Sequence, residues 1–141
     1  LKYFFNLKIG FSMKLLINSS VILFLILLSL PITLFAENLI GLPRTEGSKS
    51  FDMEINQLNN IGIKYYSLKE LDKAEEKLNK ATNLAQQLRD PSLGVIAFNR
   101  AIVLHHLHKN KEATKYFTLA KKFARGDIRI LNSQILKKYT K

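Results

Sequence analysis

Cysteine is absent from the 141 residues of this chain. Its absence excludes disulfide bonds, thiolate metal sites, a cysteine nucleophile and a lipid anchor attached to cysteine. The sequence also lacks a glycine-rich phosphate loop, a nucleophile elbow and a His-Glu-x-x-His helix. Four neighbouring carboxylates fit an exposed helix face better than an acid/base pair in a cleft. They are Glu70, Asp72, Glu75 and Glu76. We therefore expect a protein that is not an enzyme and that uses no cofactor.

Acidic residues are scarce in the C-terminal part of the chain. Residues 100–141 hold eleven Lys and Arg against Glu112 and Asp127 (11 − 2 = +9), whereas residues 37–99 hold eight against nine (8 − 9 = −1). A concentration of positive charge attracts anionic partners, and the attraction weakens with salt. One interpretation is a surface for an anionic membrane or a cell-envelope polymer; the alternative is a solvated face that keeps the protein soluble. The candidate residues are Lys115, Lys121, Lys122 and Arg125.

The first 36 residues have the layout of an export signal. A basic start that includes Lys14 precedes an uncharged apolar run at 21–28, and the small residue Ala36 ends the segment. This order is typical of a secretory signal peptide. We therefore predict that the rest of the chain is exported as a periplasmic or secreted protein of bacterial type. The alternative is an inner-membrane anchor, because residues 15–36 are long enough to cross a bilayer. Export argues against a nucleic-acid partner.

The remaining sequence divides into a linker and a helical domain. Residues 37–50 contain Gly41, Pro43 and Gly47 without hydrophobic periodicity, which predicts a flexible linker. Over residues 51–141 the apolar positions recur at spacings of three and four, which predicts helices. The expected helices cover approximately 51–67, 70–88, 93–108, 111–125 and 128–139.

Two stretches of this helical domain have the same pattern of small and large apolar residues. Residues 58–81 can be set on residues 97–120 with a shift of 39 positions, so that Ala74 falls on Ala113 and Leu78 on Phe117. Self-similarity at such a period is typical of helical repeat arrays. The small residues lie where the two helices of a hairpin approach closely.

The shared positions resemble the tetratricopeptide repeat family in its longer-repeat form. In the first stretch the matching residues are Leu58, Ile61, Gly62, Tyr65, Ala74, Leu78 and Ala81. In the second they are Ala97, Ala101, Leu104, Ala113, Phe117 and Ala120. The resemblance implies an all-α fold, a short right-handed α-solenoid of two helix-turn-helix hairpins. A C-terminal helix over 128–139 would cap the second hairpin.

The resemblance also implies a protein or peptide partner, bound in a groove lined by the first helix of each repeat. Asn59 and Ile63 occupy the places where the family's carboxylate clamp needs Lys and Asn. We therefore expect an apolar or aromatic groove that binds a helix or an extended segment. An array this short is also expected to gain stability from a partner or from self-association. The predicted groove residues are Asn56, Asn59, Ile63, Tyr66, Phe98, Ile102 and His105.

The histidines near residue 106 are the only cluster that suggests metal chemistry. His105 and His108 are three apart on one helical face, and Glu112 follows beyond the next turn. A metal site needs at least three converging ligands, and no third ligand stands at a fixed spacing. We therefore expect no metal site, and interpret these residues as groove-lining or surface histidines at a helix end.

Overall fold

The computed structural model describes residues 37–42 and 52–141, and every regular element in these ranges is a helix. This confirms an all-helical fold for the described residues. None of their helices has both the length and the apolar character that a membrane crossing requires. The predicted signal peptide or anchor over 1–36, and residues 43–51, lie outside the described residues. The helices are α2 (Met53–Ser67), α3 (Leu71–Gln87), α4 (Leu93–His106), α5 (Asn110–Lys122), α6 (Ile128–Leu131) and α7 (Gln134–Tyr139).

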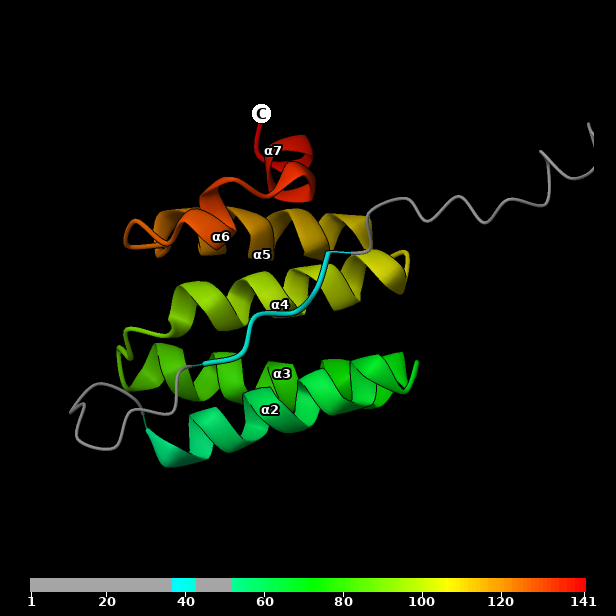
Figure 1. The fold of residues 1–141 in the computed structure, drawn as a ribbon, viewed down its shortest axis with the longest axis vertical. Coiled ribbons are helices and arrows are strands. Elements are labelled where there is room, and N and C mark those ends of the chain that lie inside the picture. The colour runs from blue at the N-terminus through cyan, green and yellow to red at the C-terminus, as the bar shows by residue number, and fades with distance from the viewer. Residues whose placement is uncertain (1–36, 43–51) are drawn as a thin grey trace, which may run out of the picture. The chain divides into compact units, whose positions relative to one another are not determined.

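The four long helices pack in chain order, each against the next, and α7 packs against α5. Figure 1 shows α4 between α3 and α5, in the middle of this arrangement. Because α4 has neighbours on both sides, every residue from Leu93 to Leu104 is buried. The nearly continuous apolar sequence of α4 agrees with this burial, because a helix that is buried around its whole circumference needs apolar residues on every face.

The two hairpins, α2–α3 and α4–α5, turn in the same way. Lys69 and His108, which are 39 residues apart, both have left-handed backbone conformations, with φ of 63° and 59°. In each turn the next backbone N–H donates to a carbonyl five residues earlier, as in a Schellman motif. These bonds join Glu70 to Tyr65 at 3.0 Å and Lys109 to Leu104 at 2.9 Å.

Glycine permits close approach of helices at two points. A Cβ on Gly62 would lie 2.7 Å from the Leu78 Cγ, so the α2–α3 crossing needs its small residue. A Cβ on Gly94 would clash with the backbone carbonyl oxygen of Phe123, at the C-terminal end of α5. The second contact is the more restrictive, because a backbone carbonyl cannot move as freely as a leucine side chain.

An aromatic cluster connects α4 with the C-terminal elements. The rings of Phe98 and Phe117 meet edge to face at 6.0 Å, and Tyr139 stacks on Phe117 at 4.9 Å. The sequence predicts one C-terminal helix over 128–139, but the structure has two. Ser133 lies between them in an extended conformation, and its Oγ accepts a hydrogen bond from the Leu136 N–H at 3.1 Å. The serine thus caps α7 and ends the continuous helix.

Residues 37–42 take an extended course across α4, drawn in cyan in Figure 1. The sequence predicts a flexible linker over 37–50, and these first six residues differ from it. Ile40 and Leu42 are only 8% and 7% exposed and belong to the hydrophobic core. Alternating burial of this kind requires a surface that exists only once the helices have packed. The rest of the predicted linker, 43–50, lies outside the described residues.

Candidate functional site

The main candidate site is the surface of α2 and α4 on which Glu37–Leu42 lies, called the docking surface here and centred on Asn59, Phe98 and Asn99. Asn99 holds both backbone groups of Ile40. Its Oδ1 accepts from the Ile40 N–H at 2.7 Å, and its Nδ2 donates to the Ile40 carbonyl at 2.8 Å. Nδ2 also donates to the Asn59 Oδ1 at 2.8 Å. This arrangement recognises an extended backbone irrespective of its side chains.

The asparagine pair is completely shielded from solvent. Asn59 and Asn99 are both 0% exposed, so the segment's backbone satisfies polar atoms that water does not reach. A buried amide without partners costs about 1–3 kcal/mol, so the segment contributes to stability through Asn99. Asn59 Nδ2 has no hydrogen-bond partner among the described residues. The docking surface therefore has polar groups that an extended backbone is suited to meet.

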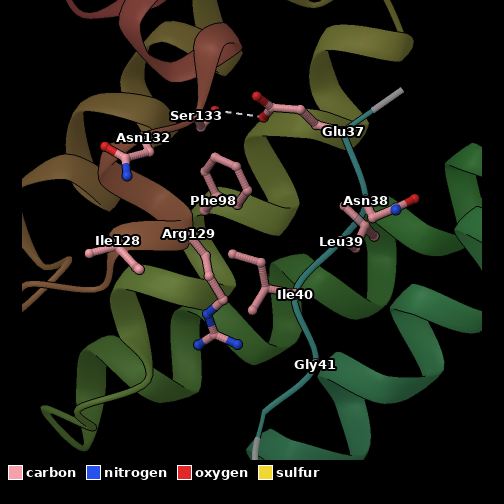
Figure 2. A pocket seen from close by; sticks show the side chains of 10 residues that line it. All are labelled: Glu37, Asn38, Leu39, Ile40, Gly41, Phe98, Ile128, Arg129, Asn132 and Ser133. Carbon is pink, nitrogen blue, oxygen red and sulfur yellow. Dashed lines mark hydrogen bonds between the residues drawn. The ribbon is translucent and has the colours of Figure 1, made fainter. Parts of the chain in front are cut away.

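The start of the segment is fastened at a second point. The Glu37 carboxylate accepts from the Ser133 Oγ at 2.6 Å and from the Gln134 N–H at 2.9 Å. It also accepts from the Ile135 N–H at 3.3 Å. Figure 2 shows Glu37 directed at Ser133. The segment thus connects α4 with the C-terminal helices, through residues separated from it by nearly the whole described chain.

An open cavity of about 520 Å³ adjoins the segment on the side of α6. The side chains of Ile40, Phe98 and Arg129 surround it in Figure 2, and Ile128 lies at its edge. Ile128 is 70% exposed, an unusual degree for a large apolar side chain. Arg129 contributes little free charge, because its Nη2 is paired with the Asp127 Oδ2 at 2.6 Å. Most of the exposed lining of the cavity is apolar, although Glu37, Asn38, Asn132 and Ser133 also line it.

The structure brings some of the predicted groove residues to the docking surface and not others. Asn59 and Phe98 belong to it, while Ile102 is buried in the core at 1% exposure. Asn56 and Ile63 are partly buried on α2. Tyr66 is also partly buried, and its hydroxyl lies 3.0 Å from the His106 Nε2.

Sequence reasoning missed Asn99 as a site residue. A signal for it exists, because it is an asparagine inside a dense apolar run and is 39 positions from Asn60. It also missed Glu37 and Ile40, which fell within the predicted linker. Their role depends on helices distant in the sequence, so no local pattern marks them.

His105 is engaged by neighbouring side chains. Its Nδ1 lies 2.8 Å from the Tyr139 hydroxyl, which donates to the Asn110 Oδ1 at 2.7 Å. Because the phenol has one hydrogen, Nδ1 of His105 must donate to the Tyr139 oxygen. Burial lowers the pKa of His105, the charges of Lys138 and His108 lower it further, and the hydrogen bond with Asn110 opposes the shift.

The pKa of His106 is lowered as well. Burial lowers its pKa, and the charges of His105, Lys69 and His108 act in the same direction. Across residues 37–42 and 52–141, no three His, Cys, Asp or Glu side chains gather as metal ligands would. The cluster around His105 and His106 is thus a set of contacts between α4, α2 and α7.

The four basic candidates all lie on α5 or just after it, and all are exposed. Lys121 donates to the Thr140 carbonyl at 3.1 Å, while Lys115 and Lys122 lie over neighbouring aromatic rings at 5.5 and 5.6 Å. Arg125 follows the helix with a φ of 49°. Within the described part of the chain, no carboxylate pairs with any of the four.

One of the four neighbouring carboxylates, that of Glu75, is partly buried, whereas the sequence pattern predicts an exposed helix face for it. Glu75 is paired with Arg100, whose Nη2 and Nε lie 2.8 and 3.1 Å from its Oε1. The guanidinium also covers the ring of Tyr116 at 4.0 Å. Since Arg100 is only 5% exposed, the pair is enclosed between α3, α4 and α5. Its geometry is that of a structural ion pair.

Comparison with protein-family models, with curated proteins and with solved structures found no match for this chain.

Proposed function

We propose that this chain is a non-catalytic protein-interaction module exported to the cell envelope, resembling tetratricopeptide repeats arranged as a short right-handed solenoid. Its docking surface on α2 and α4, the first helix of each hairpin, binds an extended segment of a partner protein. The export pattern in residues 1–36 supports the location. The matching turns at Lys69 and His108, 39 residues apart, support the repeat relationship.

One observation carries the binding proposal: Asn99 holds the N–H and the C=O of Ile40. Hydrogen bonds to backbone groups supply affinity for any extended chain, while the sockets for alternate side chains supply selectivity. Ile40 and Leu42, two residues apart, fill such sockets. A surface that already accommodates an extended segment of its own chain has the shape and the polar groups to accept another.

The test measures binding of an acetylated, amidated peptide of residues 37–42 to the full chain carrying Ile40→Ser. That substitution weakens the hold of the chain's own segment. We expect saturable binding by fluorescence anisotropy, and loss of binding when Asn99→Leu is added, because the leucine cannot bond to the peptide backbone.

Asn60→Leu in the same background is the matched control, since Asn60 is exposed and bonds only to Asn56 within the described residues. Thermal unfolding followed by circular dichroism checks that each variant remains folded. Equal binding by the Asn99→Leu and Asn60→Leu chains would contradict the proposal.

A second candidate function is binding to an anionic membrane or envelope polymer. The exposure of Lys115, Lys121, Lys122 and Arg125, without carboxylate partners in the described residues, favours it. Co-sedimentation with vesicles containing anionic lipid should fall steeply between low and physiological salt. The double substitution Lys121→Gln and Lys122→Gln should weaken it, whereas Lys64→Gln on α2 should not. Salt-independent co-sedimentation would exclude this second function.

A further inference from the structure

The chain's own segment leaves part of its docking surface unfilled. We propose that the partner segment follows the course of Glu37–Leu42 but carries an aromatic side chain in the place of Ile40. The partner segment then binds this surface more tightly than the chain's own segment, with which it competes. This inference rests on the proposed function and specifies the chemistry of the partner.

The contacts of Ile40 and Leu42 fix the register of any occupant. The Asn99 amide aligns the backbone at Ile40, and Leu42 is buried two residues further on. Successive side chains of an extended segment point to opposite sides, so positions 40 and 42 face the core together. Gly41, which lies between them, is exposed. A partner segment in the same register therefore presents its position-40 side chain toward Phe98.

The cavity beside Ile40 has room for a longer side chain. Ile40, Phe98, Ile128 and Arg129 line it, and Figure 2 shows the Ile40 side chain directed into the same space as Phe98. Ile128, which lines the same cavity as Ile40, is 70% exposed. A phenyl ring in the place of the Ile40 side chain would extend over Ile128 and bring further apolar area out of water.

The electrostatics of the cavity favour a neutral aromatic ring over an acidic side chain. Two hydrogen bonds, at 3.0 and 2.6 Å, join the Arg129 guanidinium to the Asp127 carboxylate. The pairing balances its charge but leaves the planar group available for contact with a ring. Phe98 supplies a second aromatic neighbour, and aromatic pairs gain from edge-to-face contact.

The test compares two labelled peptides of residues 37–42, one with the natural sequence and one with Ile40→Phe. Each is titrated into the full chain, in mild detergent, as wild type and as the Ile40→Ser variant. We expect the Ile40→Phe peptide to bind the variant about fivefold more tightly than the natural peptide, as extra apolar burial predicts. Wild-type chain should bind both peptides at least about tenfold more weakly than the variant, because its own segment competes.

Two matched variants locate the effect. Ile128→Ser, added to the Ile40→Ser chain, should remove the advantage of the Ile40→Phe peptide without weakening the natural peptide. Asn60→Ser changes an exposed residue of α2 that does not line the cavity, and it should leave the chain's affinity for both peptides at the wild-type level.

A measurement within the chain keeps the proposal open to refutation even when Ile40→Ser fails to fold. The full chain with Ile40→Phe should unfold at a higher temperature than wild type, and Ile128→Ser should cancel that gain. A lower unfolding temperature, or equal affinities of the two peptides, would overturn the aromatic partner. Equal binding by wild type and Ile40→Ser would overturn the competition. Absence of peptide binding by every folded variant would instead refute the proposed function itself.

Discussion

The hairpins α2–α3 and α4–α5 have the same sequence pattern and the same turn, yet they are buried to different extents. Helix α2 buries three residues, Ile55, Asn59 and Gly62, whereas α4 buries every residue from Leu93 to Leu104. The cause is position, since α4 has a packed neighbour on each side and α2 has its main neighbour on one. Equivalent positions in a repeated pattern therefore differ in energy according to what lies beside them.

This contrast predicts where the domain opens first. The α2 helix exposes Met53 at 76% and Ile61 at 41%, so its outer face holds little of the core. Segments with few buried contacts open at lower free energy than those in the core. We expect α2 to be the least stable long helix, and the four predictions below test the difference between the hairpins in order of decreasing effect.

The largest effect should come from removing the aromatic ring that joins three helices. Phe117→Ala should lower the free energy of unfolding by about 4 kcal/mol, because the ring is completely buried against Phe98 and Tyr139. The counterpart in the first hairpin, Leu78→Ala, should cost about 3 kcal/mol. Equilibrium unfolding in urea measures both. A larger loss for Leu78→Ala would contradict the proposed order of the hairpins.

The two helix crossings should differ in their tolerance of a methyl group. Gly94→Ala should cost about 3 kcal/mol, because its Cβ would meet the Phe123 backbone. Gly62→Ala should cost about 1 kcal/mol or less, since Leu78 can change rotamer and alanine favours the helix. Thermal unfolding of the two variants under identical conditions gives the comparison. Equal losses would mean that α5 can retreat from α4.

Unlike the two helix crossings, the turns of the two hairpins should respond alike to substitution by glycine. Lys69→Gly and His108→Gly should each raise the free energy of unfolding by about 1 kcal/mol, because glycine adopts positive φ without the steric cost of a Cβ. Both residues are exposed, so little packing is lost. Urea unfolding provides the values. A gain at only one turn would show that the turns differ in strain despite their shared hydrogen bonds.

The smallest effect concerns pH at the junctions of α4. The folded pKa values of His105 and His106 are lowered, so the unfolded chain binds protons more readily. Their contribution to stability is therefore present above the ordinary value of 6.5 and is lost as the pH falls through the folded pKa. The unfolding midpoint should decrease between pH 7.5 and 5.5, and less so in His105→Gln. A midpoint that rises on acidification would refute this assignment.

The helical elements could be predicted from sequence because their signals are local. The spacing of apolar residues located α2 to α5 within a few residues of their ends. The break at Ser133 was missed because apolar residues at Leu131 and Ile135 continue the helical spacing across it. At this position the capping preference of serine opposes the helical spacing of the apolar residues. In the structure Ser133 caps α7, so the preceding helix does not continue through it.

The docking of Glu37–Leu42 could not be predicted in the same way. Its contacts join residues 59 and 96–98 positions apart, and an extended chain has no periodicity that depends on such a surface. The Glu75–Arg100 pair has the same origin, since it joins adjacent helices across 25 positions. Asn99 is the residue of this site that the sequence could indicate. An amide side chain within an apolar run is expected to be buried and therefore to need hydrogen-bond partners.

Only ten residues, 43–52, separate Leu42 from Met53, the first residue of α2. A short tether holds its occupant at an effective concentration of about one millimolar. A partner present at about one micromolar must therefore bind about a thousandfold more tightly than the segment to occupy half of the sites, about 4 kcal/mol. One aromatic ring does not supply that difference. A partner of the kind proposed must therefore either contact more of the surface than six residues can reach, or be present at high local concentration.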